Sequence, residues 1–374
     1  MDRHLGNNMA QAPLTTLPAD LVSLSDYARY APQHMPEAVY EYIVGGGADE
    51  VTLKRNRTKY DDWSILPSVL TDLTKGTTKT TILGETWRHP MMLAPVAFHK
   101  LVHPQGEVAI AQAASILETG MMVSTLASVE LETIADELDS PKWFQLYFQQ
   151  SRDFTLSLVE RAEKAGYTTL VITVDAPLHG IRNRAQRAGF TLPEDVSAVN
   201  LKDRPPLPTA SFDQSESIVF QGMMSEAPTW DDIIWLQSWT EMPIVLKGIL
   251  NPNDALKAQS LGLAGIVVSN HGGRTLDCLP SSIEMLPKIR KAVGDDFPIL
   301  FDGGIERGTD VFKAIALGAD AALIGRPQLY SLAVAGAMGV GHMLRILREE
   351  LEVTMALAGT PTIDAISEES LIKG

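Results

Sequence analysis

The sequence contains a single cysteine, Cys278, in 374 residues. A disulfide within the chain is therefore excluded, and this composition is typical of proteins from a reducing compartment. A reactive thiol is conceivable at this position. Nothing nearby marks the residue as activated, however, so we interpret Cys278 as a small passive residue.

Long hydrophobic runs are also missing. No stretch is long and apolar enough to span a bilayer, and the first residues, Met1–Asn8, lack the apolar centre of a secretory signal. The last residues, Leu371–Gly374, do not form a peroxisomal tripeptide. We therefore expect a cytoplasmic protein that does not bind membranes.

Positive charge is scarce, because 31 Lys and Arg residues face 46 Asp and Glu residues, giving a formal net charge of -15. Such a chain is a poor default partner for nucleic acid or anionic membranes. Small anionic substrates are not excluded, since their binding depends on local charge. The apolar content of 45% supports a sizeable core.

Short apolar segments alternate with helical patterns after about residue 88. Each segment is continuously apolar, as is typical of parallel strands covered on both faces. The pattern predicts an α/β protein with a closed (β/α)8 TIM barrel. An open doubly wound sheet is the alternative, but no Gly-x-Gly-x-x-Gly turn follows the first strand. The predicted strands are Pro90–Ala97, Met121–Leu126, Trp143–Phe148, Thr169–Asp175, Pro243–Gly248, Gly265–Asn270, Pro298–Gly304 and Ala321–Arg326, with helices such as Val108–Leu117, Leu156–Ala165 and Asp254–Leu261.

A weak internal repeat supports the barrel, because the pattern running from Gly248 to Gly262 recurs from Gly304 to Gly318. In the two copies, Asp254 and Asp310 fall near the starts of helices. A carboxylate there helps to satisfy free backbone N–H groups. We therefore assign both residues a structural role.

We interpret residues 1–374 as one domain built around barrel strands at 89–327. Residues 1–88 form an N-terminal extension, helical over about 20–60 and capping part of the barrel. Residues 193–228, between the fourth and fifth strands, form a loop long enough to be a lid, and we expect it at the C-terminal face of the strands. Residues 328–374 are expected to be C-terminal helices.

The segment Ser269–Asp277 places His271 and Arg274 together after the sixth strand, separated by two glycines. A base beside a fixed positive charge is what proton removal from an anionic substrate requires. The glycines allow a tight turn and the close approach of a flat ligand. A surface turn with solvated side chains is the alternative for this segment taken alone.

Other predicted strand ends also carry polar residues. The turns Asp302–Gly304 and Gly325-Arg326, after strands seven and eight, are typical of a phosphate site in this architecture. Lys247, at the end of strand five, could neutralise negative charge on a cofactor ring, or it could simply extend to solvent. With the His271 segment, these ends suggest a bound phosphorylated cofactor with redox or electrophilic chemistry.

From about residue 22 to 358 the chain resembles the FMN-dependent α-hydroxy-acid oxidase and dehydrogenase family. Several motifs, in this order, carry the resemblance. Besides the segments above they are Ala94-Pro95-Val96-Ala97, His103-Pro104-Gln105-Gly106-Glu107, Trp143-Phe144-Gln145-Leu146-Tyr147, Thr173-Val174-Asp175-Ala176-Pro177, Val245-Leu246-Lys247-Gly248 and Ile324-Gly325-Arg326-Pro327.

The resemblance implies FMN as cofactor, no metal, and His271 as catalytic base, oriented by Asp175. It implies substrate contacts from Tyr42, Tyr147, Arg182 and Arg274. It implies flavin contacts from Pro95, Val96, Ala97, Ser124, Gln145, Thr173, Lys247, Ser269, Asp302, Gly303, Gly304, Gly325 and Arg326.

Three parts of the sequence depart from the family pattern. Glu306 stands where an arginine usually follows the Asp-Gly-Gly turn, and this predicts weaker FMN binding. The stretch Ser124–Ser128 lacks a bulky aromatic residue, which predicts a roomier or differently filled substrate pocket. Leu178 and His179 stand where an arginine often follows Asp175, and we interpret His179 as a loop residue.

The resemblance implies oxidation of an (S)-2-hydroxy acid of the lactate or mandelate type. Oxygen is the first choice of electron acceptor, with hydrogen peroxide as product; a dehydrogenase using quinone or another acceptor is the alternative. A flavin- or phosphate-binding barrel without redox turnover is a third reading, favoured only by Glu306. A homotetramer is also implied.

Overall fold

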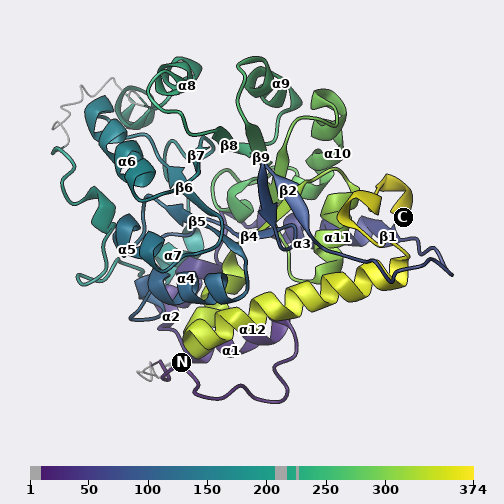
Figure 1. Cartoon of the computed structure of the whole chain (residues 1–374). Helices are drawn as coiled ribbons and strands as arrows, with labels where there is room; N and C mark the ends of the chain where they lie inside the picture. The colour runs from purple at the N-terminus through teal and green to yellow at the C-terminus, as the bar shows by residue number, and fades with distance from the viewer. Residues whose placement is uncertain (1–9, 207–216, 225–226) are drawn as a thin grey trace.

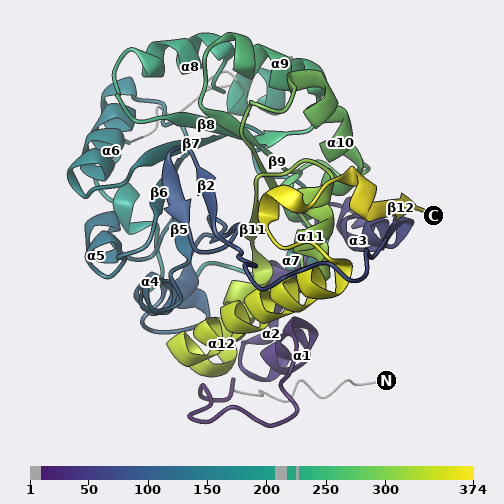
Figure 2. The same cartoon turned by 45° about the vertical axis from the view of Figure 1, so that its right-hand side comes forward.

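Parallel strands close into a single barrel, as predicted, in the computed structural model, which describes residues 10–206, 217–224 and 227–374 (Figures 1 and 2). The observed strands mostly end before the predicted ones, because the residues beyond them leave the ladder to form turns at the barrel rim. The strands are β4 (Met91–Leu93), β5 (Gly120–Ser124), β6 (Lys142–Leu146), β7 (Thr169–Thr173), β8 (Ile244–Ile249), β9 (Gly265–Val268), β10 (Ile299–Asp302) and β11 (Ala321–Ile324).

The strands are apolar throughout because both of their faces are buried. Along β10, for example, Ile299 and Phe301 belong to the cluster that packs under the helices, whereas Leu300 belongs to a second cluster inside the barrel. Trp143 and Met92 fill the same interior cluster. The barrel is therefore a packed core, and a ligand can enter only at its ends.

Helices surround the barrel (Figure 2). The three predicted helices are confirmed, although each begins a little earlier than predicted. The starts of two of them are set by caps, since the side chains of Ser151 and Asn251 accept backbone N–H groups of the first turn. The helices are α4 (Glu107–Ile116), α5 (Leu131–Asp136), α6 (Arg152–Lys164), α8 (Trp230–Gln237), α9 (Pro252–Ser260), α10 (Ser282–Val293), α11 (Gly308–Ala316) and α12 (Arg326–Ala358).

The expectation that no stretch is long and apolar enough to span a bilayer is wrong for α12, which alone among the described helices passes that test by length and composition. However, 72% of its apolar stretch is buried inside the fold, and the helix packs against α1 (Leu24–Tyr30), α4 and α11. Its apolar surface therefore serves the protein core.

The N-terminal extension is helical where predicted, in α1, α2 (Glu37–Val44) and α3 (Val51–Thr58). Its later part is not helical. Strands β2 (Thr80–Ile82) and β3 (Glu85–Trp87) form a hairpin whose Ile82 and Trp87 side chains join the interior cluster of the barrel. This hairpin was not predicted, because three-residue strands have too little periodicity to detect.

The C-terminal region is helical in α12 and in short 3-10 turns at Ile363–Ala365 and Glu368–Ser370, but its last residues form a strand instead. Strand β12 (Leu371–Lys373) pairs antiparallel with β1 (Trp63–Ile65). In the predicted lid, the structure describes short turns at Val199–Leu201 and Ile218–Met223. Residues 207–216 and 225–226 of the lid lie outside the described residues, as does Met1–Asn8.

The structural role assigned to Asp310 is confirmed. Its carboxylate accepts the backbone N–H groups of Glu306 and Arg307 and pairs with Arg57. The repeat partner, Asp254, lies in the first turn of α9, the position at which a carboxylate complements the helix dipole.

Candidate active site

A cavity of about 890 Å³ opens at the C-terminal ends of the barrel strands. This volume lies within the usual range for small-molecule sites, roughly 300–1,000 Å³. All the predicted site residues line it except Asp175 and Ser269, which stand behind it as hydrogen-bond partners of lining residues. The predicted lining residues are Tyr42, Pro95, Val96, Ala97, Ser124, Gln145, Tyr147, Thr173, Arg182, Lys247, His271, Arg274, Asp302, Gly303, Gly304, Gly325 and Arg326.

His271 lies at the wall of this cavity, in the turn that follows β9. Its backbone is in the left-handed region, with φ +58°, a costly conformation that clusters at functional sites when a residue other than glycine adopts it. Its backbone N–H donates to the Ser269 hydroxyl, 3.0 Å away. The ring is thus held in place and remains partly exposed to the cavity.

Asp175, just after β7, lies 3.0 Å from His271 Nδ1 through its Oδ1 atom. Burial alone would raise the pKa of Asp175, but His271 and Lys247 lower it. Because an ionised carboxylate can only accept, Nδ1 carries the hydrogen, and Nε2 of the neutral ring is free to take a proton. Gly248 makes room for this pair, since a Cβ atom there would lie 2.5 Å from the Asp175 side chain.

Lys247 is buried in a polar group that includes its counter-ion. Its Nζ atom lies 2.7 Å from Asp302 Oδ2 and donates to the Ser269 hydroxyl at 2.9 Å. That hydroxyl donates in turn to Asp302 Oδ1 at 2.6 Å. The ends of β8, β9 and β10 are therefore joined by one charge-neutral network facing the cavity.

Three arginines converge at another part of the cavity wall. Arg274 donates to the carbonyls of Tyr42, Ile43 and Gly45, and Arg326 donates to those of Ile43, Gly45 and Gly272. These partners are neutral. Burial lowers the pKa of Arg274 to about 9, with further lowering by Arg182 and Arg326, and burial and Arg182 lower the pKa of Arg326.

Arg182 completes this group, which we call the arginine cluster: Arg182, Arg274 and Arg326. Its guanidinium lies 5.6 Å from the centre of the Tyr42 ring, and that of Arg274 lies 5.1 Å from the same ring. The Nε atom of Arg182 is buried without a hydrogen-bond partner in the described structure. Like charges gathered with only neutral partners form a site for an anion.

Two tyrosines face the same region. Tyr42 stacks on Phe190 with ring centres 4.1 Å apart, so its orientation is fixed. Burial, with Asp175 adding to it, raises the pKa of Tyr147 well above its usual value. Tyr147 therefore stays protonated and can donate a hydrogen bond into the cavity.

The residues present fit a flavin mononucleotide. The Oε1 atom of Gln145 accepts from the Ser124 hydroxyl and the Thr125 N–H, whereas its Nε2 donor is buried without a described partner. Such a donor is costly to bury unless a ligand satisfies it. A flat ring can lie close to the apolar stretch Pro95–Ala97. The glycines of the turn after β10 let the backbone approach the part of FMN that joins this ring to the phosphate.

The departures from the family pattern also line the cavity. Glu306 lies beside Gly304 and Arg326, and burial and Asp310 raise its pKa while Arg57, Arg307 and Arg326 oppose this shift. Leu126 stands in the stretch that lacks an aromatic residue. His179 also reaches the cavity lining.

Sequence reasoning missed a buried pair of asparagines that supports the His271 turn. Asn56 of α3 and Asn270 exchange two hydrogen bonds of 2.7 Å, and Asn270 also accepts from the Gly273 N–H. Asp277 accepts backbone N–H groups at the start of α3, including that of Thr52. An asparagine inside a helix pattern was the available signal, but its partner lies too far away in the sequence to be identified.

Comparison with known proteins agrees with this geometry. A family model described as FMN-dependent dehydrogenase matches residues 31–373. The chain belongs to this family. FMN is therefore its cofactor, and the barrel is the scaffold that holds it.

Several relatives match over nearly the whole chain. An L-lactate oxidase of Alicycliphilus denitrificans is 44% identical over 360 residues, covering 96% of this chain and 99% of that protein. A peroxisomal (S)-2-hydroxyacid oxidase of Arabidopsis thaliana is 42% identical, covering 93% and 95%. A crystal structure of mandelate oxidase with (S)-2-phenylpropionate superimposes with a TM-score of 0.85 at 41% identity, covering 94% and 98%.

Proposed function

We propose that this enzyme oxidises an (S)-2-hydroxy acid to the 2-oxo acid and passes the electrons to oxygen, forming hydrogen peroxide. The observation that carries the proposal is the arginine cluster beside the His271–Asp175 pair, because it joins an anion site to a base. The names of the relatives, which include oxidases of lactate and of 2-hydroxy acids, agree with this chemistry.

In this proposal Arg182 and Arg274 hold the substrate carboxylate. Holding it fixes the α-carbon in one place and reduces the entropic barrier. Tyr42 and Tyr147 donate to the substrate, since Tyr147 is kept protonated. Because no carboxylate of the protein pairs with Arg182 or Arg274 in the described structure, both guanidinium groups can turn toward the carboxylate of a substrate.

His271 then removes a proton from the substrate at Nε2, and Asp175 stabilises the resulting imidazolium. FMN would supply the oxidising chemistry when bound, by accepting the two electrons and the second of the two hydrogens that leave the substrate. The proton that His271 takes is the one on the α-carbon if that hydrogen leaves as a proton, and the hydroxyl proton if the α-hydrogen leaves as a hydride. The base and its partner are the same in both cases.

We place the FMN phosphate near Gly303, Gly304, Gly325 and Arg326, and the ring near Pro95–Ala97, Gln145 and Lys247. Two features support this placement. The glycine turns allow backbone to approach a phosphate closely, and Lys247, paired with Asp302, brings an ammonium group to the cavity wall. The remaining contacts with FMN, made directly or through Lys247, would come from Ser124, Thr173, Ser269 and Asp302.

We assign the substrate side chain to the apolar part of the cavity lined by Leu126, Phe148, Leu201 and Met223. An aliphatic residue at 126 leaves room for a methyl or a phenyl substituent. Lactate-type and mandelate-type acids therefore both fit the proposal, and glycolate would leave this part of the cavity unfilled.

Anaerobic reduction of the holoenzyme by glycolate, by lactate and by the two enantiomers of mandelate tests the proposal. We expect bleaching of the flavin by (S)-lactate and (S)-mandelate, weaker bleaching by glycolate, and peroxide formation when oxygen is admitted. A yellow protein that none of these acids bleaches would overturn the proposal and favour a barrel without redox turnover.

A second candidate, a dehydrogenase that passes electrons to a quinone, is favoured by one observation. The turn Ile218–Met223 exposes four apolar side chains, Ile218, Val219, Phe220 and Met223, near the cavity entrance, and exposed apolar groups of this kind mark interaction sites. Stopped-flow reoxidation of the reduced enzyme by dissolved oxygen separates the two. A rate far below turnover would favour the quinone.

We also propose that the enzyme is a cytoplasmic homotetramer. The lone cysteine supports a reducing compartment, and the family resemblance supports the tetramer. Light scattering on the purified holoenzyme tests the oligomeric state.

A further inference from the structure

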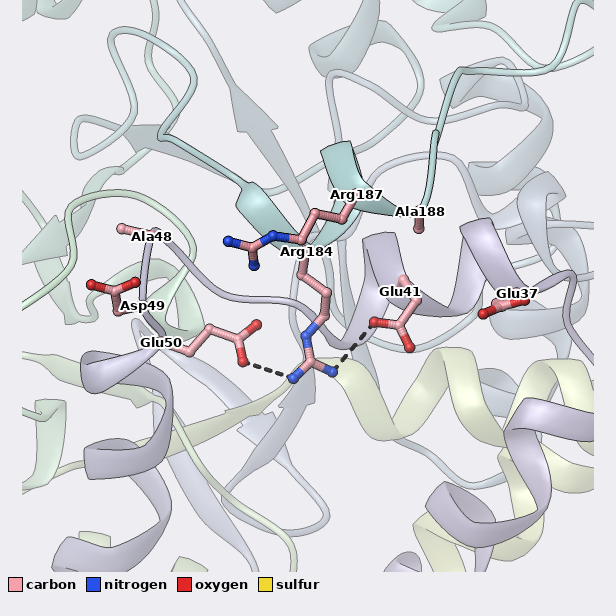
Figure 3. A pocket seen from close by; sticks show the side chains of 8 residues that line it. All are labelled: Glu37, Glu41, Ala48, Asp49, Glu50, Arg184, Arg187 and Ala188. Carbon is pink, nitrogen blue, oxygen red and sulfur yellow. Dashed lines mark hydrogen bonds and ion pairs between the residues drawn. The ribbon is translucent and has the colours of Figure 1, made fainter. Parts of the chain in front are cut away.

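Arg184 connects the two elements that carry substrate-binding side chains, on the side facing away from the cavity. Its Nη2 atom lies 2.7 Å from Glu50 Oε2, and its Nη1 atom lies 3.5 Å from Glu41 Oε2 (Figure 3). The other oxygen of Glu50 accepts the Gly46 N–H at 3.0 Å. One guanidinium thus links α2, the turn after it, the start of α3, and the short helix α7 (Asn183–Arg187).

These elements position the arginine cluster and its tyrosine. Tyr42 follows Glu41 on α2, and Arg182 is the residue at which α7 begins. The side chain of Arg184 also packs against Gly45, where a Cβ atom would lie 3.3 Å from its Cδ atom. The Gly45 carbonyl is one of those that hold Arg274 and Arg326.

The helix α7 also packs against α2 and buries Ala185. The helix has five residues, too few to be stable without tertiary contacts. The Ala48 N–H donates to the Ile181 carbonyl at 2.8 Å, and Phe190 stacks on Tyr42. Glu50 is only 12% exposed, so its ion pair is screened less than a surface pair would be.

We propose that Arg184 is a positioning residue, which holds α2 and α7 together so that Tyr42 and Arg182 stay at the spacing a substrate carboxylate requires. This role rests on the proposed function, because it concerns how the same site binds a 2-hydroxy acid. Arg184 itself does not line the main cavity. Its effect must therefore appear in substrate binding through Tyr42 and Arg182.

The test compares Arg184→Gln with Arg187→Gln in the holoenzyme. Arg187 lies one turn along the same helix and lines the same outer cleft, but it makes no ion pair within the described structure (Figure 3). Anaerobic rapid mixing with (S)-lactate gives the substrate Kd and the limiting rate of flavin reduction. For Arg184→Gln we expect Kd to rise about tenfold, as loss of a charged hydrogen bond would produce, with a much smaller change in the limiting rate.

Arg187→Gln should leave both quantities unchanged, and Arg184→Lys should recover part of the affinity, because an ammonium can pair with one carboxylate. An unchanged Kd in Arg184→Gln, with or without a lower melting temperature, would overturn the proposal. If Arg184→Gln does not retain FMN, Glu50→Gln makes the same test, because its amide oxygen can still accept the Gly46 N–H. Failure of the acids to bleach the wild-type flavin would instead contradict the proposed function.

Discussion

Two parts of the cavity wall handle positive charge in opposite ways. Around Lys247 the protein supplies its own counter-charge, because the ammonium pairs with Asp302 and donates to the Ser269 hydroxyl. In the arginine cluster the partners are backbone carbonyls, and burial, followed by the like charges, lowers the pKa of Arg274. The first arrangement is complete without substrate, whereas the second is complete only when an anion arrives.

This difference separates stability from binding. A buried pair that loses one partner leaves an uncompensated charge, so its loss costs stability. A cluster of like charges gains little stability from any one member, and its loss costs affinity for the anion instead. Substitutions around Lys247 should therefore lower the stability of the protein, whereas substitutions in the arginine cluster should lower its affinity for the substrate.

The largest effect is expected at His271, which lies between the two parts. His271→Gln removes the base and should slow flavin reduction by about 10²–10⁴-fold, while the protein remains yellow because the predicted FMN contacts persist. Anaerobic stopped-flow reduction measures this rate. Turnover at the wild-type rate would rule out His271 as the base.

Lys247→Met should destabilise the protein, because Asp302 would stay buried without its partner. We expect the free energy of unfolding to fall by about 3 kcal/mol, measured by urea unfolding of the FMN-free chain. Lys288→Met, at an exposed position of α10, is the control and should change little. Equal stability of the two variants would mean that the Lys247 network contributes no more than a surface charge.

Arg274→Gln should reduce substrate affinity more than it reduces stability, the reverse of what we expect for Lys247→Met. We expect kcat/KM for (S)-lactate to fall about 100-fold, since hydrogen bonds between charged groups are worth roughly 1.5–3 kcal/mol each. The free energy of unfolding should change less than in Lys247→Met, because repulsion within the arginine cluster is relieved. A larger loss of stability than of substrate affinity would contradict the comparison.

The sequence was sufficient for the barrel and for the residues at its mouth. Continuous apolar runs locate strands that are buried on both faces, and the polar residues that end them, such as Asp175 and His271, must then meet at one rim. Contacts between distant segments were not predictable. The Asn56–Asn270 pair and the links of Arg184 to Glu41 and Glu50 depend on how separate turns pack, which leaves no periodic signal.

Glu306 differs from both positively charged parts, because it brings a carboxyl group to the cavity wall. It lies at the end of the cavity where we place the FMN phosphate. Burial raises its pKa, Asp310 adds to this, and Arg57, Arg307 and Arg326 oppose it. Tyr60 and Tyr330 also face it, with pKa values raised by burial, and both stay neutral. The ionised form of Glu306 is thus disfavoured, and a phosphate dianion would disfavour it further.

FMN binding should therefore take up a proton at Glu306, and the Kd for FMN should rise as pH increases through the pKa of this group. Glu306→Gln removes that dependence and should tighten FMN binding a few-fold at pH 8, the smallest effect proposed, in line with a partly screened like-charge interaction. Fluorescence quenching of FMN by the FMN-free chain between pH 5.5 and 8.5 measures both curves. Because free FMN titrates equally in both experiments, the ratio of the two curves isolates what Glu306 contributes; Glu368→Gln, at an exposed C-terminal position, should follow the wild type. Parallel curves for Glu306→Gln and the wild type would place the phosphate away from this carboxyl.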